Sequence, residues 1–313
     1  MALPASDLVR FGENAELYQL GLSNLYHDTL AANPNSYQEW LAEIPAKQFY
    51  KTEMGITGLS TMPAHDIGSP IKLDRPIVTP KKSYTMAVYA IGMVLQYEVF
   101  RWDLFGAYKP VTEDLAKTAN VRYELVAYAL FNNAFSTADP VYTDYRNEAL
   151  CSVTHTRGDG GTWQNRPSSP VGLSMMALNI ATTLLKKTVN DRGQFVGNAM
   201  QLKPKRCVTT TENGWLASIL FESQYNPENN NMQYNNAKSM GIGVTTSAYI
   251  TLTTPWFILC DKNSSYRIKL AQGDKPDLVK DNEPSTRNML MTSYCSFRLE
   301  VYEAKGWLGD QGV

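Results

Sequence analysis

Few residues in this sequence have the type and spacing that catalysis or metal binding requires. Its three histidines, His27, His65 and His155, are far apart in the chain, so the paired ligands of an H-E-x-x-H zinc site are missing. Glu113 and Asp114 are adjacent carboxylates, but acids at the start of a predicted helix stabilise the positive end of its dipole. We therefore predict no catalytic residue, no metal site and no bound cofactor.

Motifs for nucleophilic catalysis and for nucleotide binding are missing as well. The sequence contains no G-x-S-x-G elbow, no Walker loop and no G-x-G-x-x-G. The segment Gly241–Gly243 lacks a third glycine and is interpreted as a turn before a strand. Arg157–Asp159 resembles a cell-adhesion tripeptide, but three residues recur by chance, so a plain loop is the better interpretation.

Composition narrows the class of protein further. The net charge is −1, from 29 basic and 30 acidic residues, whereas dedicated nucleic-acid-binding domains carry a net basic surface. The longest apolar stretch, Met86–Leu95, is far shorter than the roughly 18 residues of a membrane span. Four isolated cysteines fit a reducing cytoplasm, where a free thiol packs as a small apolar group: Cys151, Cys207, Cys260 and Cys295. We expect a soluble cytoplasmic product that contacts no membrane.

Apolar spacing predicts several helices. An N-terminal helix is predicted over Asn14–Ala32 and a short one over Tyr37–Glu43. A long helix is predicted over Val111–Asn133, with Thr112 as its cap. A second helix is predicted from Pro170 to Lys187, and a third over Glu212–Ser223, where Thr residues precede the helix.

A long excursion separates the arm from the long helix. Residues from Glu53 to Lys82 are rich in glycine and proline, which forbids long helices. Tyr84–Ile91 and Met93–Phe100 are β-prone, and Gly92 is predicted to interrupt them. A loop of this length without a core is functional or disordered, and its apolar content favours contact with a partner.

The C-terminal part is predicted to be mainly strands. Strands are expected over Tyr249–Leu252, Trp256–Cys260, Tyr266–Leu270 and Met289–Val301, the last from its alternation of apolar and polar residues. Before them, Tyr225–Ala237 is rich in asparagine, which is typical of a surface loop or a symmetry contact.

The order of these elements resembles that of tailed-bacteriophage major capsid proteins with the Hong Kong 97-type fold, particularly the branch of Mu-like head subunits. Arg101–Asp103 and the helix Val111–Asn133 are similar to the family's spine helix and the residues before it. Gln201–Val208 and Thr251–Asp261 are similar to strands at the two ends of its axial domain. Arg287–Tyr302 is similar to the closing strand of its peripheral domain.

The resemblance implies an α+β fold with an N-terminal arm, an extended β-hairpin loop, a long spine helix, a peripheral domain and an axial domain. The implied boundaries are 1–52 for the arm, 53–103 for the extended loop, 104–208 for the peripheral domain with the spine and second helices, 209–262 for the axial domain, and 263–313 for the C-terminal strands of the peripheral domain.

The resemblance also implies a structural head protein, not an enzyme, that self-assembles into hexamers and pentamers of an icosahedral shell around double-stranded DNA. Assembly would take place in the host bacterial cytoplasm and the product would be the virion. The implied partners are other copies, a portal protein and a separate scaffolding protein, with a decoration protein as a further candidate and DNA bound without sequence preference.

Two sets of residues would make the contacts between copies. The extended loop would contact a neighbour through Ile56, Met62, Ile67, Ile71, Lys72, Leu73 and Arg75. The axial loop would meet its copies at the symmetry centre through Asn229, Asn230, Asn231 and Tyr234. Removal of Ile56–Lys82 is then expected to leave a soluble subunit that cannot form closed particles.

Two alternatives remain open from the sequence. An encapsulin-like compartment shares the fold and encloses proteins instead of DNA. A polysaccharide-active hydrolase would use an aromatic cleft and two carboxylates, since the chain has six tryptophans and 18 tyrosines. Most of these tryptophans lie in apolar runs, where a role in the core is the better interpretation.

Overall fold

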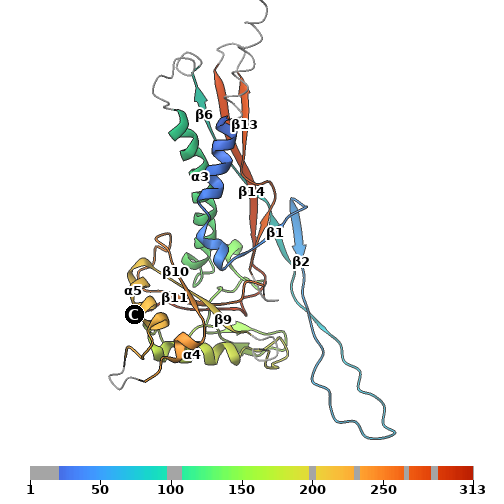
Figure 1. The fold of residues 1–313 in the computed structure, drawn as a ribbon. Helices are drawn as coiled ribbons and strands as arrows, with labels where there is room; N and C mark the ends of the chain where they lie inside the picture. The colour runs from blue at the N-terminus through green and yellow to red at the C-terminus, as the bar shows by residue number, and fades with distance from the viewer. Residues whose placement is uncertain are drawn as a thin grey trace, which may run out of the picture.

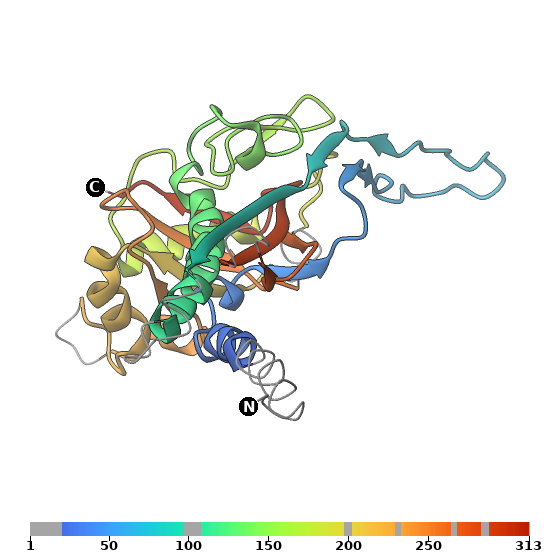
Figure 2. The ribbon, with the colours of Figure 1, turned by 90° about the horizontal axis from the view of Figure 1, so that it is seen from above.

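The computed structural model describes residues 21–96, 108–196, 202–228, 233–263, 268–282 and 288–312. Figure 1 shows an upright body in which helix α3 lies beside a sheet, a second body below it that holds α4 and α5, and a loop that projects from their side. Seen from above, the loop again points away from both bodies (Figure 2). No described helix is long and apolar enough to cross a membrane.

The arm begins with a helix and continues as a strand. Residues 21–32 are helical, as predicted, whereas residues 14–20 of that prediction lie outside the described residues. The helix predicted over Tyr37–Glu43 is wrong, because the chain forms the 3-10 helix η1 (Ser36–Glu39) and then strand β1 (Ala42–Pro45). Strand β1 pairs in parallel with β12 (Lys269–Gln272), and this edge position tolerates a proline.

Helix α3 (Tyr108–Asn132) confirms the predicted spine helix and contains 25 residues. The prediction that Thr112 caps it is wrong, because Thr112 lies inside the helix and is fully buried. Pro110 is compatible with this earlier start, since a proline in a first helical turn removes no helical hydrogen bond. Leu115 packs in an upper apolar cluster and Phe131 in a lower one, so the helix connects two cores.

The upper sheet is built around strand β14 (Met289–Glu300), which confirms the predicted closing strand. Strands β12 and β13 (Asp277–Asn282) pair with successive parts of one edge of β14, and β1 extends the sheet beyond β12. Strand β6 (Ala87–Leu95) pairs with the other edge of β14. The predicted interruption at Gly92 is wrong, because β6 continues through it. A Cβ atom at Gly92 would come within 2.8 Å of Thr292 Cγ2, so glycine here permits close packing between strands.

The lower sheet has the order β10 (Gly243–Thr246), β9 (Pro204–Thr209), β11 (Trp256–Cys260) and β15 (Trp307–Asp310) among the described strands. All five residues of β11 are buried, which confirms it as a central strand. The strand predicted over Tyr249–Leu252 is wrong. Asn132 at the end of α3 holds that segment as a turn, through bonds of 2.9 Å to Tyr249 O and from Thr251 N.

Helices α4 (Met175–Lys186), α5 (Thr211–Glu222) and α6 (Asn236–Ser239) pack against the lower sheet. The predicted start of α4 at Pro170 is wrong, because Ser174 is the cap and accepts a hydrogen bond from Ala177 N at 3.1 Å. The third predicted helix is confirmed as α5. The remaining described elements are short: β2 (Tyr50–Glu53), β3 (Ile56–Thr57), β4 (Ile77–Val78), β5 (Lys82–Thr85), η2 (Pro140–Tyr142), β7 (His155–Thr156) and β8 (Thr162–Trp163).

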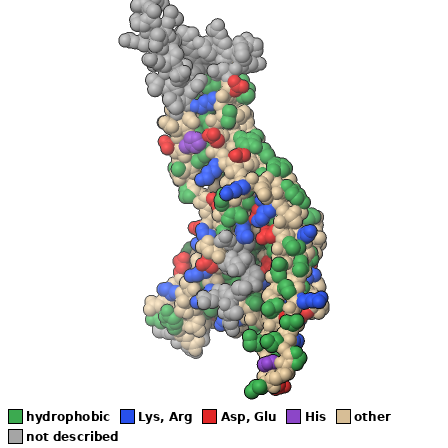
Figure 3. Space-filling view, turned by 90° about the vertical axis from the view of Figure 1, so that its right-hand side faces the viewer, with side chains coloured by type: hydrophobic (Ala, Val, Ile, Leu, Met, Phe, Trp, Pro, Cys, Tyr) green, Lys and Arg blue, Asp and Glu red, His purple; other side chains and the backbone are tan. Residues whose placement is uncertain are grey.

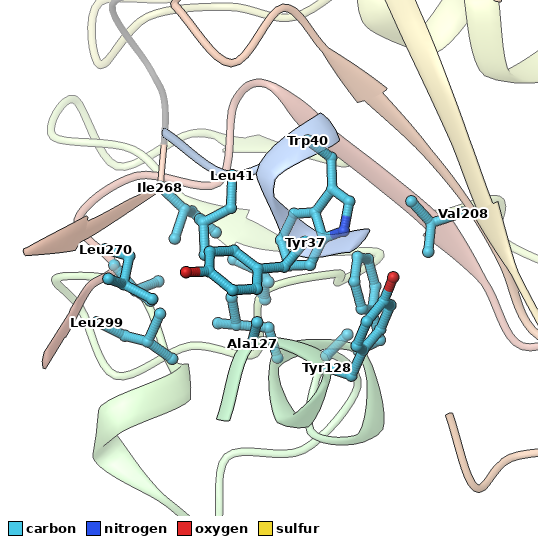
Figure 4. Close-up of a cluster of buried hydrophobic side chains, with 14 of the residues drawn as sticks. Tyr37, Trp40, Leu41, Ala127, Tyr128, Val208, Ile268, Leu270 and Leu299 are labelled. Atoms are coloured by element: carbon cyan, nitrogen blue, oxygen red, sulfur yellow. The ribbon is translucent and has the colours of Figure 1, made fainter. Parts of the chain in front are cut away.

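Aromatic rings fill the core where the lower half of α3 meets both sheets. Figure 4 shows Tyr37 and Trp40 of the arm directed toward Ala127 and Tyr128 of α3. The ring of Phe131 is fully buried. Its centroid lies 4.8 Å from that of Trp40, 4.8 Å from Phe257 and 5.0 Å from Trp307. This one side chain therefore joins the arm, the spine helix and the lower sheet.

Replacing Phe131 by alanine should lower the free energy of unfolding by about 3–5 kcal/mol, because the change removes a buried ring and leaves a cavity. Chemical denaturation monitored by tryptophan fluorescence would measure it. The control is Val121→Ala on the exposed side of the same helix, for which a change within about 0.5 kcal/mol is expected. A cost for Phe131→Ala no larger than the control would contradict this account of the core.

Candidate inter-subunit surface

The projecting loop is a ribbon that is paired only near its base. Strands β2 and β5 pair over four residues each, and β3 and β4 over two. Beyond this pairing the chain from Gly58 to Pro76 contains no strand or helix. The sequence prediction of a protruding hairpin is confirmed, although most of its length lacks β-structure.

The two sides of the loop come together at a neck formed by Gly55 and Thr79. Tyr302, from the chain just after β14, holds this neck. Gly55 N donates to Tyr302 Oη at 2.5 Å and to Thr79 Oγ1 at 2.9 Å. Tyr302 Oη donates in turn to Pro80 O at 3.2 Å, and its ring stacks on that of Tyr145 at 5.0 Å. A Cβ atom at Gly55 would lie only 2.8 Å from Thr79 Oγ1, so this contact needs glycine.

A second set of polar contacts fixes the two strands of the loop to the turn at residues 190–194. Thr57 Oγ1 donates to Asp191 Oδ2 at 2.8 Å, and Gln194 Nε2 donates to Thr61 Oγ1 at 2.9 Å. Arg192 NH1 lies 3.2 Å from Asp74 Oδ2. The loop is therefore anchored as far as Thr61 on its outgoing side and Asp74 on its returning side.

Two carboxylates in these contacts are held in the charged form. A hydrogen bond from Ser60 N, together with Arg192, lowers the pKa of Asp74 to about 2. Burial alone would raise the pKa of Asp191, but Lys305 and the hydrogen bonds at its carboxylate outweigh burial and lower that pKa. Both anchors are thus ionised at neutral pH, when they accept hydrogen bonds most strongly.

A buried ion-pair group lies where the loop joins the upper sheet. Lys51 Nζ is 2.6 Å from Glu300 Oε2, and Arg298 NH2 is 3.0 Å from Glu300 Oε1. Arg298 NH1 also donates to Gln48 O at 2.7 Å. On the other strand of the loop, burial lowers the pKa of Lys82 to about 8, and its ammonium group donates to Thr143 O.

The loop exposes large apolar side chains, four of them between the anchors at Thr61 and Asp74 and one, Ile56, before them. The exposed fractions are 67% for Ile56, 91% for Met62, 104% for Ile67, 77% for Ile71 and 91% for Leu73. Lys72 and Arg75 are exposed beside them. Contiguous exposed apolar side chains mark an interaction surface. All seven loop residues predicted to contact a neighbour are therefore accessible, and that contact itself remains a prediction.

The outer face of the upper sheet is a second exposed apolar surface. Side chains there are between 37% and 61% exposed: Val88, Val94, Val279, Leu290 and Tyr294. The other face of the sheet is covered by α3 and by residues 21–32, where Tyr26 Oη lies 2.5 Å from Ser293 Oγ. Figure 3 shows hydrophobic side chains on the side that carries both this face and the loop.

A third exposed apolar surface lies on α5, at the opposite side of the molecule from the loop (Figures 1 and 2). Trp215 is 80% exposed, Leu216 40% and Ile219 37%. Sequence analysis predicts a core role for most tryptophans, and Trp215 is an exception. The sequence signal for this surface is a second apolar stripe on α5, which lies beside the buried stripe of Ala217, Leu220 and Phe221.

The asparagine-rich loop after α5 is only partly described. Asn229, Asn230 and Asn231 lie outside the described residues, whereas Tyr234 is described and is 62% exposed. Asn235 has an internal role: it is fully buried, and its Nδ2 donates to Leu220 O at 2.7 Å.

A buried polar group that sequence analysis missed lies below α3. His155 is fully buried, and its Nδ1 lies 3.3 Å from Glu148 Oε2 and 3.6 Å from Asp144 Oδ2. Burial opposes the charge of His155, but the two carboxylates raise its pKa to about 9. The sequence gives no signal for this group, because a carboxylate seven residues before a histidine is not a recognised ligand spacing.

The cysteines are buried and free, in line with the predicted structural role. Burial raises the pKa of Cys207 and of Cys260 to about 12, so these thiols are not nucleophiles at neutral pH. The described tryptophans also do not line one shared cleft, since Trp40, Trp256 and Trp307 are buried while Trp215 is exposed.

Comparison with known proteins rests on structure, because no protein-family model and no curated protein matches the sequence. The capsid of a native GTA particle has a TM-score of 0.53 at 11% identity, over 87% of this chain and 88% of that one. A virus-like particle from Pyrococcus furiosus has a TM-score of 0.52 at 10% identity, over 93% and 98%. The procapsid of bacteriophage JBD30 has a TM-score of 0.50 at 11% identity, over 99% and 76%.

The likeness covers 87–99% of this chain in these three structures. The chain has the Hong Kong 97-type capsid fold. At these levels of identity the likeness concerns the fold, so the role of each surface must be argued from this chain's own residues.

The neck contacts predict a specific effect of Tyr302→Phe. Loss of the hydroxyl removes a partner of Gly55 N and of Pro80 O, and should cost roughly 1 kcal/mol. Amide hydrogen exchange near Gly55 and Thr79 should become about fivefold faster, with no change at residues 62–73. Tyr294→Phe on the exposed sheet face is the control. Unchanged exchange at Gly55 in Tyr302→Phe would show that Tyr302 does not hold the neck.

Proposed function

We propose that this chain is a shell-forming subunit, the major capsid protein of a tailed phage, which assembles through its projecting loop. The observation that carries the proposal is the combination of two features of the loop. Its neck is anchored to the body of the subunit, and its tip, residues 62–73, exposes the apolar side chains of Met62, Ile67, Ile71 and Leu73. A tip that cannot bury itself on its own subunit lowers its free energy by packing on another copy. The shared fold supports the proposal, because each of the three matched structures is a capsid, procapsid or virus-like particle.

The proposed assembly consists of hexamers and pentamers that close into an icosahedral shell around double-stranded DNA. The loop lies on the opposite side of the subunit from the exposed face of α5, here called the Trp215 surface (Figure 1). A subunit that contacts its neighbours through two different faces makes heterologous contacts, and such contacts form rings when the rotation closes. In this proposal the arm is 1–52, the extended loop 53–103, the peripheral domain 104–208 and 263–313, and the axial domain 209–262. Portal, scaffolding and decoration proteins are proposed partners.

The expected energy of the loop contact is large for so short a segment. Fully burying one large aliphatic side chain contributes roughly 1.5–3 kcal/mol, and four such side chains lie between the two anchors: Met62, Ile67, Ile71 and Leu73. The anchors also hold both ends of this segment before assembly, so little chain entropy remains to be lost at the neck.

A compartment that encloses proteins is the second candidate function. The observation in its favour is that the likeness to the virus-like particle from Pyrococcus furiosus covers 98% of that chain. The content of purified particles separates the two functions: nuclease-protected DNA supports a phage shell, whereas a stoichiometric cargo protein supports a compartment.

Replacing the four tip residues by serine (Met62→Ser, Ile67→Ser, Ile71→Ser and Leu73→Ser) should abolish closed particles and leave a folded subunit. The anchors at Thr61 and Asp74 remain, so the melting temperature of the subunit should stay within about 2 °C of the unmodified chain. Electron microscopy and light scattering would measure assembly. His65→Gln on the same tip is the control and should assemble normally. Closed shells of normal size from the fourfold variant would refute the proposed role of the tip.

The Trp215 surface predicts a separate defect. Trp215→Ser should reduce the yield of closed particles at least tenfold, because exposed tryptophan is a common anchor of protein interfaces. Met176→Ser, on α4 of the same lower body and 71% exposed, is the matched control and should assemble like the unmodified chain. Equal yields from Trp215→Ser and Met176→Ser, measured by sedimentation, would exclude this surface from the assembly contacts.

A further inference from the structure

The geometry points to a binding site for one divalent transition-metal ion, zinc, formed by Asp144, Glu148 and His155. None of these three residues belongs to the apolar surfaces described above, and the inference does not depend on the proposed function. One ligand atom from each residue lies within 4.8 Å of the others. Zinc sites of this kind use imidazole nitrogen and carboxylate oxygen, with a water molecule as fourth ligand.

His155 Nδ1 faces the two carboxylates. The hydrogen bonds of Asn165 determine that this nitrogen carries no hydrogen when the ring is neutral. Asn165 Nδ2 donates to Leu150 O at 2.7 Å and to Trp307 O at 3.0 Å. Its Oδ1 accepts from Ser152 N at 2.9 Å and lies 2.9 Å from His155 Nε2. The hydrogen of a neutral His155 must therefore be on Nε2, which leaves the lone pair of Nδ1 directed at Glu148 and Asp144.

Two carboxylates that face this nitrogen require a positive charge between them, which the proton of a charged imidazole supplies when no ion is bound and which a metal ion supplies when it displaces that proton. His155 Nδ1 is buried and has no hydrogen-bond partner among the described residues. Its separations of 3.3 Å from Glu148 Oε2 and 3.6 Å from Asp144 Oδ2 exceed the roughly 2.7–2.9 Å of a charge-assisted hydrogen bond. The edge of a tetrahedron around zinc is about 3.3–3.5 Å for ligand bonds of about 2.0–2.1 Å, so the Glu148 separation matches it and the Asp144 separation is slightly longer.

The residues around the group support each ligand, and Glu148 Oε2 accepts a hydrogen bond from Thr156 N at 3.0 Å. Asp144 Oδ1 accepts from Arg146 N at 2.8 Å and Glu148 N at 2.9 Å, which leaves Oδ2 for the ion. Trp163 stacks on the His155 ring at 4.4 Å. Hydrogen bonds that orient the ligands in this way are a regular feature of metal sites. The Glu148 side chain is 23% exposed, which gives the ion and its water a path from solvent.

The choice of zinc follows from the ligand set. An imidazole nitrogen suits zinc and its neighbours among the transition metals, whereas magnesium and calcium prefer oxygen ligands. A bound ion would stiffen the segment from Asp144 to Asn165. Lys82, at the base of the projecting loop, donates to Thr143 O beside this segment, so the ion would also strengthen the support of the loop.

Zinc binding can be tested on the full chain after removal of any affinity tag and treatment with a chelator. We expect equilibrium dialysis followed by elemental mass spectrometry to find about one zinc ion per chain, together with a higher melting temperature. Magnesium and calcium at the same concentration should leave the melting temperature unchanged. Glu148→Gln and His155→Gln should each weaken zinc binding at least tenfold, and Gln at 155 keeps a donor toward Asn165.

Two matched controls separate this site from other places where zinc could bind. His65→Gln on the loop and Asp159→Asn in the same polar segment should bind zinc like the unmodified chain. Cobalt(II) should give visible absorption bands of a four-coordinate ion without the near-ultraviolet band of a thiolate ligand. The inference is overturned if the unmodified chain binds no zinc, if Glu148→Gln and His155→Gln bind it equally well, or if a thiolate band shows that cysteine is the ligand.

Discussion

The hydrogen bonds at the neck of the loop are the constraint on which the proposed assembly depends. Gly55 and Thr79 are tied to Tyr302, and Thr57 and Asp74 further out are tied to Asp191 and Arg192. A flexible loop would lose much conformational entropy on binding a neighbour. A loop with fixed ends loses less, so its apolar tip contributes more of its burial energy to association.

The neck can hold the loop because it is attached to a body with a continuous core. Strand β14 contributes Glu300 to the ion pairs at the base of the loop and Phe297 to the aromatic core. Phe131 links this core to the arm and to the lower sheet. The base of the loop is therefore joined to the same core that holds the arm and the lower sheet.

Sequence reasoning recovered the elements that have a strong local pattern. The spine helix, β11, β14 and α5 follow from apolar spacing over many residues. It failed where a distant partner decides: Ala42–Pro45 is a strand because β12 is beside it, and Tyr249–Leu252 is a turn because Asn132 holds it. The loop tip could be identified from its apolar residues. The neck could not, since Gly55 and Tyr302 are 247 residues apart in sequence.

The central claim is that the loop tip of one copy is covered by another copy, and cross-linking tests it most directly. Unlabelled and nitrogen-15-labelled chains would be mixed, assembled and treated with an amine-reactive cross-linker, because Lys72 lies on the tip and is exposed. The account predicts that peptides containing Lys72 form cross-links between labelled and unlabelled chains. Cross-links of Lys72 confined to single chains, in a sample that contains closed particles, would contradict it.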